Sequence, residues 1–140
     1  MVVADGQGVP LGVYLASATP NEVTLIEITL GQVAVPRKGR GRPRKNPPRL
    51  IYDKAADSDP LRDRLAKRGI DLICPHRANR IKPKRQDGRK LRRYKRRWKI
   101  ERSIAWIANF RRLLVRYERQ IMMFYAFVHV ACLLIALRQL

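Results

Sequence analysis

The spacing of apolar and polar positions changes several times along the chain, and each change predicts a different element. Residues 2–3 and 9–16 are mostly apolar and are separated by the turn residues of segment 5–8, so they predict a β-hairpin. From Asn21 onwards, apolar side chains recur at three- and four-residue steps until Gly31. That pattern predicts a helix with one apolar face.

The middle of the chain combines two short apolar runs with a helical pattern between them. The runs 49–53 and 70–75 predict strands. Segment 57–69 predicts a helix that is capped by Asp57 or Ser58 and ends at Gly69. Strand, helix and strand in this order indicate a βαβ unit with parallel pairing, so the fold class is expected to be α/β.

The last third of the chain predicts two long helices that follow a basic loop at 76–89. The first should reach Tyr117, and its apolar stripe consists of Ile100, Ile104, Ile107, Phe110 or Arg111, Leu114 and Tyr117. The second is the apolar run 121–137. It is short for a membrane span, which prefers about 20 residues, so we expect a helix buried between the core and a partner rather than a membrane anchor. All elements fit one domain spanning residues 1–140.

Charge changes this picture more than any other property. The chain has 31 Lys and Arg residues against 11 Asp and Glu, a net charge of +20 that destabilises a compact state by self-repulsion. A partner with dense negative charge, most commonly nucleic acid, would relieve this repulsion. Cys74 and Cys132 lie far apart without metal-ligand spacing and no signal peptide is visible, so we expect reduced thiols in a cytoplasmic protein.

Two segments concentrate the basic residues. Segment 34–48, "AVPRKGRGRPRKNPP", has no apolar periodicity and predicts a flexible basic loop. Its core resembles the Arg-Gly-Arg-Pro core of AT-hook peptides, and two interpretations stay open: minor-groove binding, or a spacer that contacts phosphates. Segment 77–99 predicts a basic surface that contacts successive phosphates along a nucleic-acid backbone. The candidate DNA-binding residues are Arg40, Arg42, Arg44, Lys45, Arg89, Lys90, Arg92, Arg93 and Arg96.

One acid, Glu101, stands alone among the bases of the first long helix. Tyr94, Arg97 and Glu101 occupy positions i, i+3 and i+7 and so share a helix face. Glu101 either pairs with Arg97 in an ordinary helix ion pair or holds a divalent cation beside a bound phosphodiester. A second carboxylate is then required. Asp53 follows a predicted parallel strand, at the strand end where α/β sheets place ligand-binding residues.

The segments "RLIYDKAADSDPLRDRLAKRGIDLICPHR" and "YKRRWKIERSIAWIANFRRLLVRYER" resemble the C-terminal half of bacterial insertion-sequence transposases of the DDE class. The resemblance implies a partial ribonuclease-H-like fold and a site with two Mg²⁺ ions. It implies that Asp53 is the second catalytic acid and Glu101 the third, both as metal ligands, with Tyr94 and Arg97 as supporting residues of the Tyr-Arg-Glu pattern. Ala56 and Ala108 depart from the family pattern, which often has Tyr and Lys there.

The family's first catalytic Asp normally lies on a strand upstream of segment 2–10. We therefore expect a truncated catalytic domain that is inactive alone, joined by frameshifting to the product of an upstream reading frame or left from a decayed element. Transposon ends, target DNA and a further copy of the chain are the expected partners. A non-catalytic basic DNA-binding protein and a membrane-anchored basic protein are the alternatives.

Overall fold

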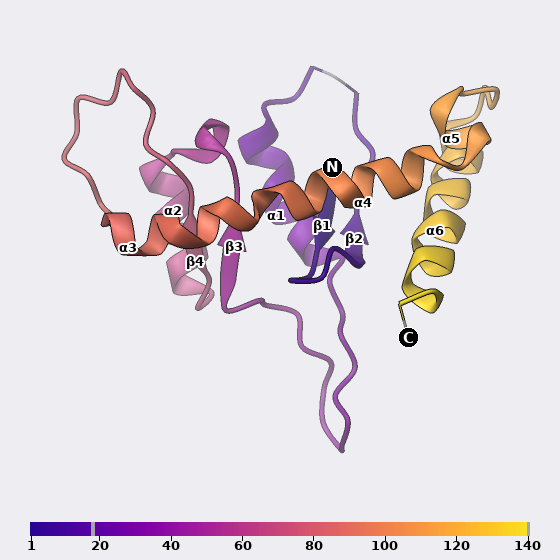
Figure 1. The fold of residues 1–140 in the computed structure, drawn as a ribbon, viewed down its shortest axis with the longest axis horizontal. Coiled ribbons are helices and arrows are strands. Elements are labelled where there is room, and N and C mark those ends of the chain that lie inside the picture. Colours follow the sequence, from indigo (N-terminus) through magenta and orange to yellow (C-terminus); the bar gives the residue numbers. More distant parts are fainter. Residues whose placement is uncertain (18, 140) are drawn as a thin grey trace.

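A computed structural model describes residues 1–17 and 19–139 and shows a mixed α/β chain (Figure 1). Its first two strands, β1 (Val2–Ala4) and β2 (Pro10–Val13), pair antiparallel. The turn between them is organised by Asp5, whose carboxylate accepts hydrogen bonds from the backbone N–H groups of Gln7 and Val9 at 2.8 and 2.9 Å. The predicted hairpin is confirmed.

Helix α1 (Glu22–Gly31) also follows its prediction. Asn21 caps it, because its side-chain oxygen accepts a hydrogen bond from the Val23 N–H at 3.1 Å. Ile26 and Leu30 on its buried face are 2% and 0% exposed. They join the main core with residues from the following βαβ unit, so α1 connects the two halves of the molecule.

The βαβ unit consists of β3 (Arg49–Ile51), α2 (Asp59–Lys67) and β4 (Asp71–Ile73), with β3 and β4 parallel as predicted. A short 3₁₀ turn, η1 (Lys54–Ala56), follows β3. Leu61 and Leu65 of α2 are fully buried against the sheet. Ser58 occupies the cap position of α2 but makes no side-chain cap hydrogen bond, and the Asp57 side chain is used elsewhere.

The predicted continuous helix up to Tyr117 is wrong. The chain instead forms α3 (Gly88–Leu91), the 3₁₀ segment η2 (Arg92–Arg97), α4 (Trp98–Ala108) and the short α5 (Arg111–Leu114). The α3, η2 and α4 segments form one rod across Figure 1. Like charges three and four residues apart oppose α-helical winding in η2. Phe110 is extended (ψ 108°) and interrupts the helix between α4 and α5.

The last helix, α6 (Ile121–Leu137), has the predicted bounds, but only one stripe of it is buried. Tyr125 donates a hydrogen bond to the carbonyl of Val13 in β2 at 2.6 Å, and Val128 and Ala131 are buried. Other apolar side chains are exposed, as for Met122 at 72%. No helix within the described part of the chain has the length and apolarity to cross a membrane.

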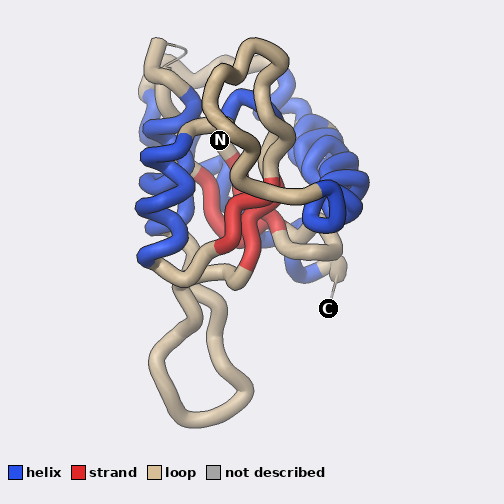
Figure 2. Tube along the Cα trace, turned by 90° about the vertical axis from the view of Figure 1, so that its left-hand side faces the viewer, coloured by secondary structure: helices blue, strands red, loops and turns tan. Residues whose placement is uncertain are grey.

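The strands form two separate two-stranded sheets, β1–β2 and β3–β4. In Figure 1, β3 and β1 are neighbours, with β4 and β2 outside them. Figure 2 shows the strands between helices on one side and the rod on the other. Among residues 1–17 and 19–139 no strand pairs with the free edge of β1 or of β3, so the layer is interrupted at its centre.

The rod is fastened to the first hairpin through α4. Ser103 is fully buried, and its hydroxyl donates to the carbonyl of Gly8 at 2.6 Å. Arg102 donates to the carbonyl of Gln7 at 2.5 Å and lies between the rings of Trp98 and Trp106, 5.0 and 4.8 Å from their centroids. Both tryptophans therefore help to hold α4 on the turn.

Gly8→Ala should destabilise this junction. Gly8 has φ +90°, and a Cβ there would lie 3.2 Å from the Ser103 hydroxyl and 3.3 Å from the Lys99 carbonyl. We expect a loss of about 1–3 kcal/mol in the free energy of unfolding, measured by urea denaturation followed by circular dichroism. Gly6→Ala is the matched control, because a Cβ added at Gly6 would have no other atom within 4 Å. Equal stability of the two variants would contradict the tight fit at Gly8.

Candidate active site and nucleic-acid interface

Asp53 lies two residues beyond the end of β3 and begins the η1 turn. Its Oδ1 accepts a hydrogen bond from the Ala55 N–H at 2.8 Å, which fixes the carboxylate at the strand end. The side chain of neighbouring Tyr52 donates to Glu22 of α1 at 3.1 Å. Burial and the Glu22 carboxylate raise the pKa of Tyr52, so this phenol stays protonated and anchors the strand end to α1.

Glu101 lies in the first turn of α4 and is largely exposed. Its Oε1 is 2.8 Å from a guanidinium nitrogen of Arg97, and Arg97 in turn lies 5.9 Å from the ring centroid of Tyr94. The structure thus brings together the three residues of the predicted pattern. The ion pair forms between i and i+4 on the surface, a type that contributes about 0.3–0.5 kcal/mol.

The contact that relates the segments of Asp53 and Glu101 is between β3, which precedes Asp53, and η2, which leads into α4. Each acid uses one carboxylate oxygen within the chain, Oδ1 of Asp53 and Oε1 of Glu101. Their second oxygens are the kind of hard ligand that Mg²⁺ takes, and Mg²⁺ needs only one or two carboxylates besides substrate phosphates. Among the residues with described positions, no cluster of three or more His, Cys, Asp or Glu forms a metal site.

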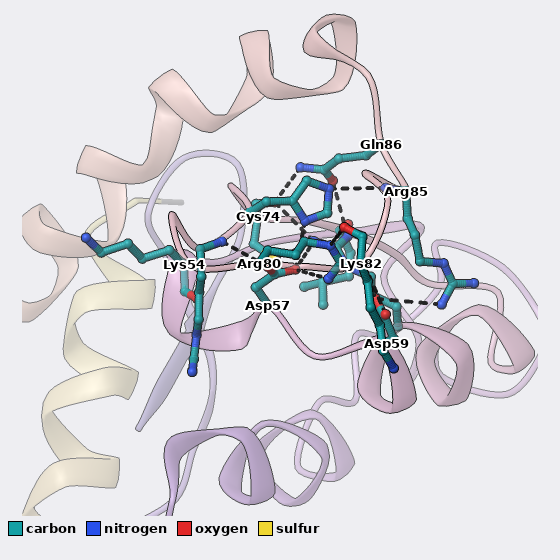
Figure 3. Close-up of polar contacts among 12 residues, drawn as sticks. Lys54, Asp57, Asp59, Cys74, Arg80, Lys82, Arg85 and Gln86 are labelled. Atoms are coloured by element: carbon teal, nitrogen blue, oxygen red, sulfur yellow. Dashed lines mark hydrogen bonds and ion pairs between the residues drawn. The ribbon is translucent and has the colours of Figure 1, made fainter.

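A second carboxylate near Asp53, that of Asp57, is 2% exposed and has four polar partners (Figure 3). They are Arg62 at 3.2 Å, the His76 Nδ1 at 2.9 Å, the Arg77 N–H at 2.9 Å and Arg80 at 3.4 Å. Burial alone would raise the pKa of Asp57, but the bonds from Arg77, His76 and Arg62 outweigh it and lower the pKa. Asp57 therefore stays ionised in the interior.

The contacts of His76 fix its tautomer. Its Nε2 accepts a hydrogen bond from the Arg85 N–H at 3.2 Å, so the proton of the neutral ring lies on Nδ1 and is donated to Asp57. Arg62 also donates to the carbonyls of Leu72 and Cys74 at the end of β4. Burial raises the pKa of the Cys74 thiol to about 11, as expected for a reduced core cysteine.

The same network supports the turn that carries Asp53. Arg77 donates its side-chain N–H groups to the carbonyls of Lys54 at 3.2 Å and Ala55 at 2.9 Å, while Asp57 binds its backbone N–H. The chain around residues 76–80 is thereby clamped onto η1. Local sequence patterns do not reveal this role, because it depends on contacts between residues about twenty positions apart. The one available signal is a second acid four residues after Asp53.

The basic residues fall into two groups. Some bases of segment 77–99 already form ion pairs within the chain: the largely buried Arg80 pairs with Asp59 at 2.9 Å, and the exposed Arg85 pairs with Asp63 at 2.7 Å. The candidate Lys90 pairs with Asp71 at 2.9 Å. The other candidates are exposed, and none of their side chains makes an ion pair with a residue of the described ranges. They are Arg89, Arg92, Arg93 and Arg96 on the rod, and Arg40, Arg42, Arg44 and Lys45 in the loop between α1 and β3.

Comparison with known sequences identifies the class. The Transposase DDE domain family matches residues 1–136, and the chain belongs to this family of insertion-sequence DDE transposases. A Burkholderia cepacia protein assigned as a transposase for insertion sequence element IS402 is 35% identical over 135 residues, which cover 96% of this chain. The chain spans only 60% of the length of that relative. No solved structure matches the chain.

Asp57→Asn should destabilise the protein and flatten its response to acid. The folded pKa of Asp57 lies below its unfolded value, so the carboxylate stabilises the fold above that value and the stabilisation is lost as pH falls below about 4. Removing the buried charge from its cationic partners should cost about 3 kcal/mol at pH 7. Urea denaturation at pH 7, 5 and 3 measures both effects.

Asp63→Asn is the control for this experiment. Asp63 also pairs with an arginine, Arg85, but its side chain is 55% exposed. This variant should keep nearly the full stability at pH 7 and should lose stability in acid as the unmodified chain does. If Asp57→Asn behaves in the same way, the buried network does not carry the stability assigned to it.

Proposed function

We propose that this chain supplies two of the three acids of a Mg²⁺-dependent site for DNA strand cleavage and transfer in transposition. The observation that supports the proposal is where Asp53 and Glu101 lie in the fold. In a chain of the DDE transposase family, Asp53 follows β3, and β3 packs against η2, the segment that leads into the helix of Glu101. Among the described residues, one carboxylate oxygen of each acid accepts no hydrogen bond.

Each of these residues has a distinct task in this proposal. Asp53 and Glu101 would hold Mg²⁺, which activates the attacking oxygen and stabilises the leaving oxygen of the phosphodiester. Arg97 orients the Glu101 carboxylate, and its guanidinium can form an ion pair with a nearby phosphate instead. Tyr94 lies against the Arg97 guanidinium and limits its rotation. The Arg77 clamp keeps the Asp53 turn in place.

The third acid would come from a strand that fills the centre of the layer. The free edges of β1 and β3 leave their backbone groups available for pairing. In a ribonuclease-H-like sheet, a strand with the first Asp would lie between them and bring its carboxylate to Asp53 and Glu101. A further segment of the same polypeptide, or the product of an upstream reading frame, would supply it. Residues 1–140 alone should therefore bind DNA without cutting it.

A second candidate function is DNA binding without catalysis. The exposed arginines of the rod and the net charge of +20 favour it, since both suffice to bind a polyanion without a metal. The two functions differ in their response to a chelator. Binding is unaffected in either case, whereas strand cleavage by the completed protein requires Mg²⁺ only if Asp53 and Glu101 act as proposed.

In a protein completed with the missing strand, Glu101→Gln should reduce the rate of strand cleavage about 1,000-fold or more, because a neutral amide is a poor Mg²⁺ ligand. Cleavage of a labelled transposon-end duplex measures the loss, and an electrophoretic mobility shift shows that binding persists. Glu27→Gln is the matched control, since Glu27 forms a comparable surface ion pair with Arg64 at 2.7 Å. Equal cleavage by both variants would refute the assignment.

A basic side chain that already forms an ion pair within the chain should contribute less to DNA binding than one that does not. Replacing Arg92 and Arg93 by Ala should reduce the slope of log affinity against log salt concentration by about 0.9 for each phosphate that is no longer neutralised. Lys90→Ala should change the slope less, because Lys90 already pairs with Asp71. Fluorescence anisotropy between about 50 and 200 mM salt measures the slopes. A larger change per replaced residue in Lys90→Ala than in the Arg92/Arg93 double variant would contradict this division.

A further inference from the structure

The loop between α1 and β3 projects from the body as an arm, visible at the bottom of Figures 1 and 2. We define the arm as residues 35–45. Its base is closed by Val35 and Arg44, whose backbone groups exchange two hydrogen bonds of 3.0 and 2.8 Å. Next to it, Asn46 exchanges side-chain hydrogen bonds with Arg68 at the end of α2. The arm therefore has a fixed root.

Beyond its root the arm can bind a partner without breaking interactions with the body. Residues 36–43 are exposed throughout and form no hydrogen bond with any other described residue. Pro36 and Pro43 lack an N–H group, and only the single bridge at Val35 and Arg44 pairs the two legs. A two-stranded ribbon suited to a major groove would need a longer ladder than this. The tip can instead follow the shape of a narrow site as a single extended strand.

The arm's charge has no counterpart within the protein. It contains six bases and no acid, and none of the six forms an ion pair with a described residue. Around the βαβ unit, by contrast, acids lie against bases, as for Arg80 with Asp59 and Lys90 with Asp71. The self-repulsion of the arm therefore persists until an external anion approaches.

The order of residues favours a groove over isolated phosphate contacts. The backbone bends at 38–41, with Gly41 at φ +143°. Because Arg40, Arg42 and Arg44 alternate with Gly41 and Pro43, an extended backbone formed on binding would place the three arginines on one side at intervals of about 6.6 Å. Two base-pair steps of DNA span about 6.8 Å. Gly41 has no side chain to hold the backbone away from a groove floor. Arginine is the side chain that narrow A·T-rich minor grooves attract through their enhanced negative potential.

We propose that the arm inserts Arg40, Arg42 and Arg44 into the minor groove of A·T-rich duplex DNA. This inference rests on the proposed function, which makes DNA the partner, and adds that the chain prefers one class of sequence. The rod arginines contact phosphates of any sequence, whereas the arm selects narrow grooves. We assign the preference for A·T-rich DNA to the arm because its cations are on a narrow segment that projects from the body and fits a narrow groove.

The test compares two fluorescein-labelled duplexes of equal length, one an A·T tract and one of G·C pairs, by anisotropy at constant salt. The whole chain should bind the A·T duplex about tenfold more tightly. In the double variant R40K/R42K the charge is unchanged, but the weakly hydrated planar guanidinium is lost. This variant should bind both duplexes with the affinity that the unmodified chain shows for the G·C duplex.

The matched control is R92K/R93K, which makes the same chemical change on the rod and should keep the tenfold preference. Equal affinity of the unmodified chain for both duplexes would overturn the arm proposal and leave DNA binding intact. A preference that survives in R40K/R42K would also overturn it, because the preference for the A·T duplex would not depend on these arginines. Failure to bind either duplex would instead refute the proposed function on which the inference rests.

Discussion

The hydrogen bond between Ser103 and Gly8 connects residues 95 positions apart and fastens α4 to the turn of the first hairpin. The two sheets share no ladder, so their backbone pairing cannot hold them together. Packing of α1 against both halves and of the rod against the first hairpin replaces that pairing. Glu101 is two residues from Ser103, and its position relative to the rest of the molecule is therefore set at this junction.

The distribution of acids explains how a chain with a net charge of +20 can fold. Asp57, Asp59 and Asp63 lie beside the arginines of the loop that follows β4 and neutralise it locally. A buried charge such as that of Asp57 adds little net stability, but removing one partner is costly, so its contacts specify the loop path more than they strengthen the fold. The rod and the arm carry many of the bases that form no ion pair with a described residue, and at both places an external polyanion can reach them.

Local patterns predicted the elements whose causes are local. The turn over segment 5–8, the helix that begins near Asn21 and the alternation of β3, α2 and β4 all depend on residues a few positions apart, and each was confirmed. The helix boundary after Ala108 was missed, since apolar spacing continued through it while the backbone turned at Phe110 to bring α6 onto β2. Local spacing predicted Asp57 or Ser58 as the cap of α2, and it did not reveal the partners of Asp57, because His76 and Arg77 belong to a distant segment.

At the candidate site, local spacing predicted a contact correctly, but that contact constrains the site only weakly. The sequence pattern paired Arg97 with Glu101, and the structure forms this pair, yet an exposed pair of about 0.3–0.5 kcal/mol is a weak constraint. A divalent cation and a phosphate could replace both partners at little cost, with the cation taken by Glu101 and the phosphate by Arg97. The two interpretations of Glu101 are therefore compatible. In the structure the ion pair holds the Glu101 carboxylate beside Arg97 on the exposed surface of α4.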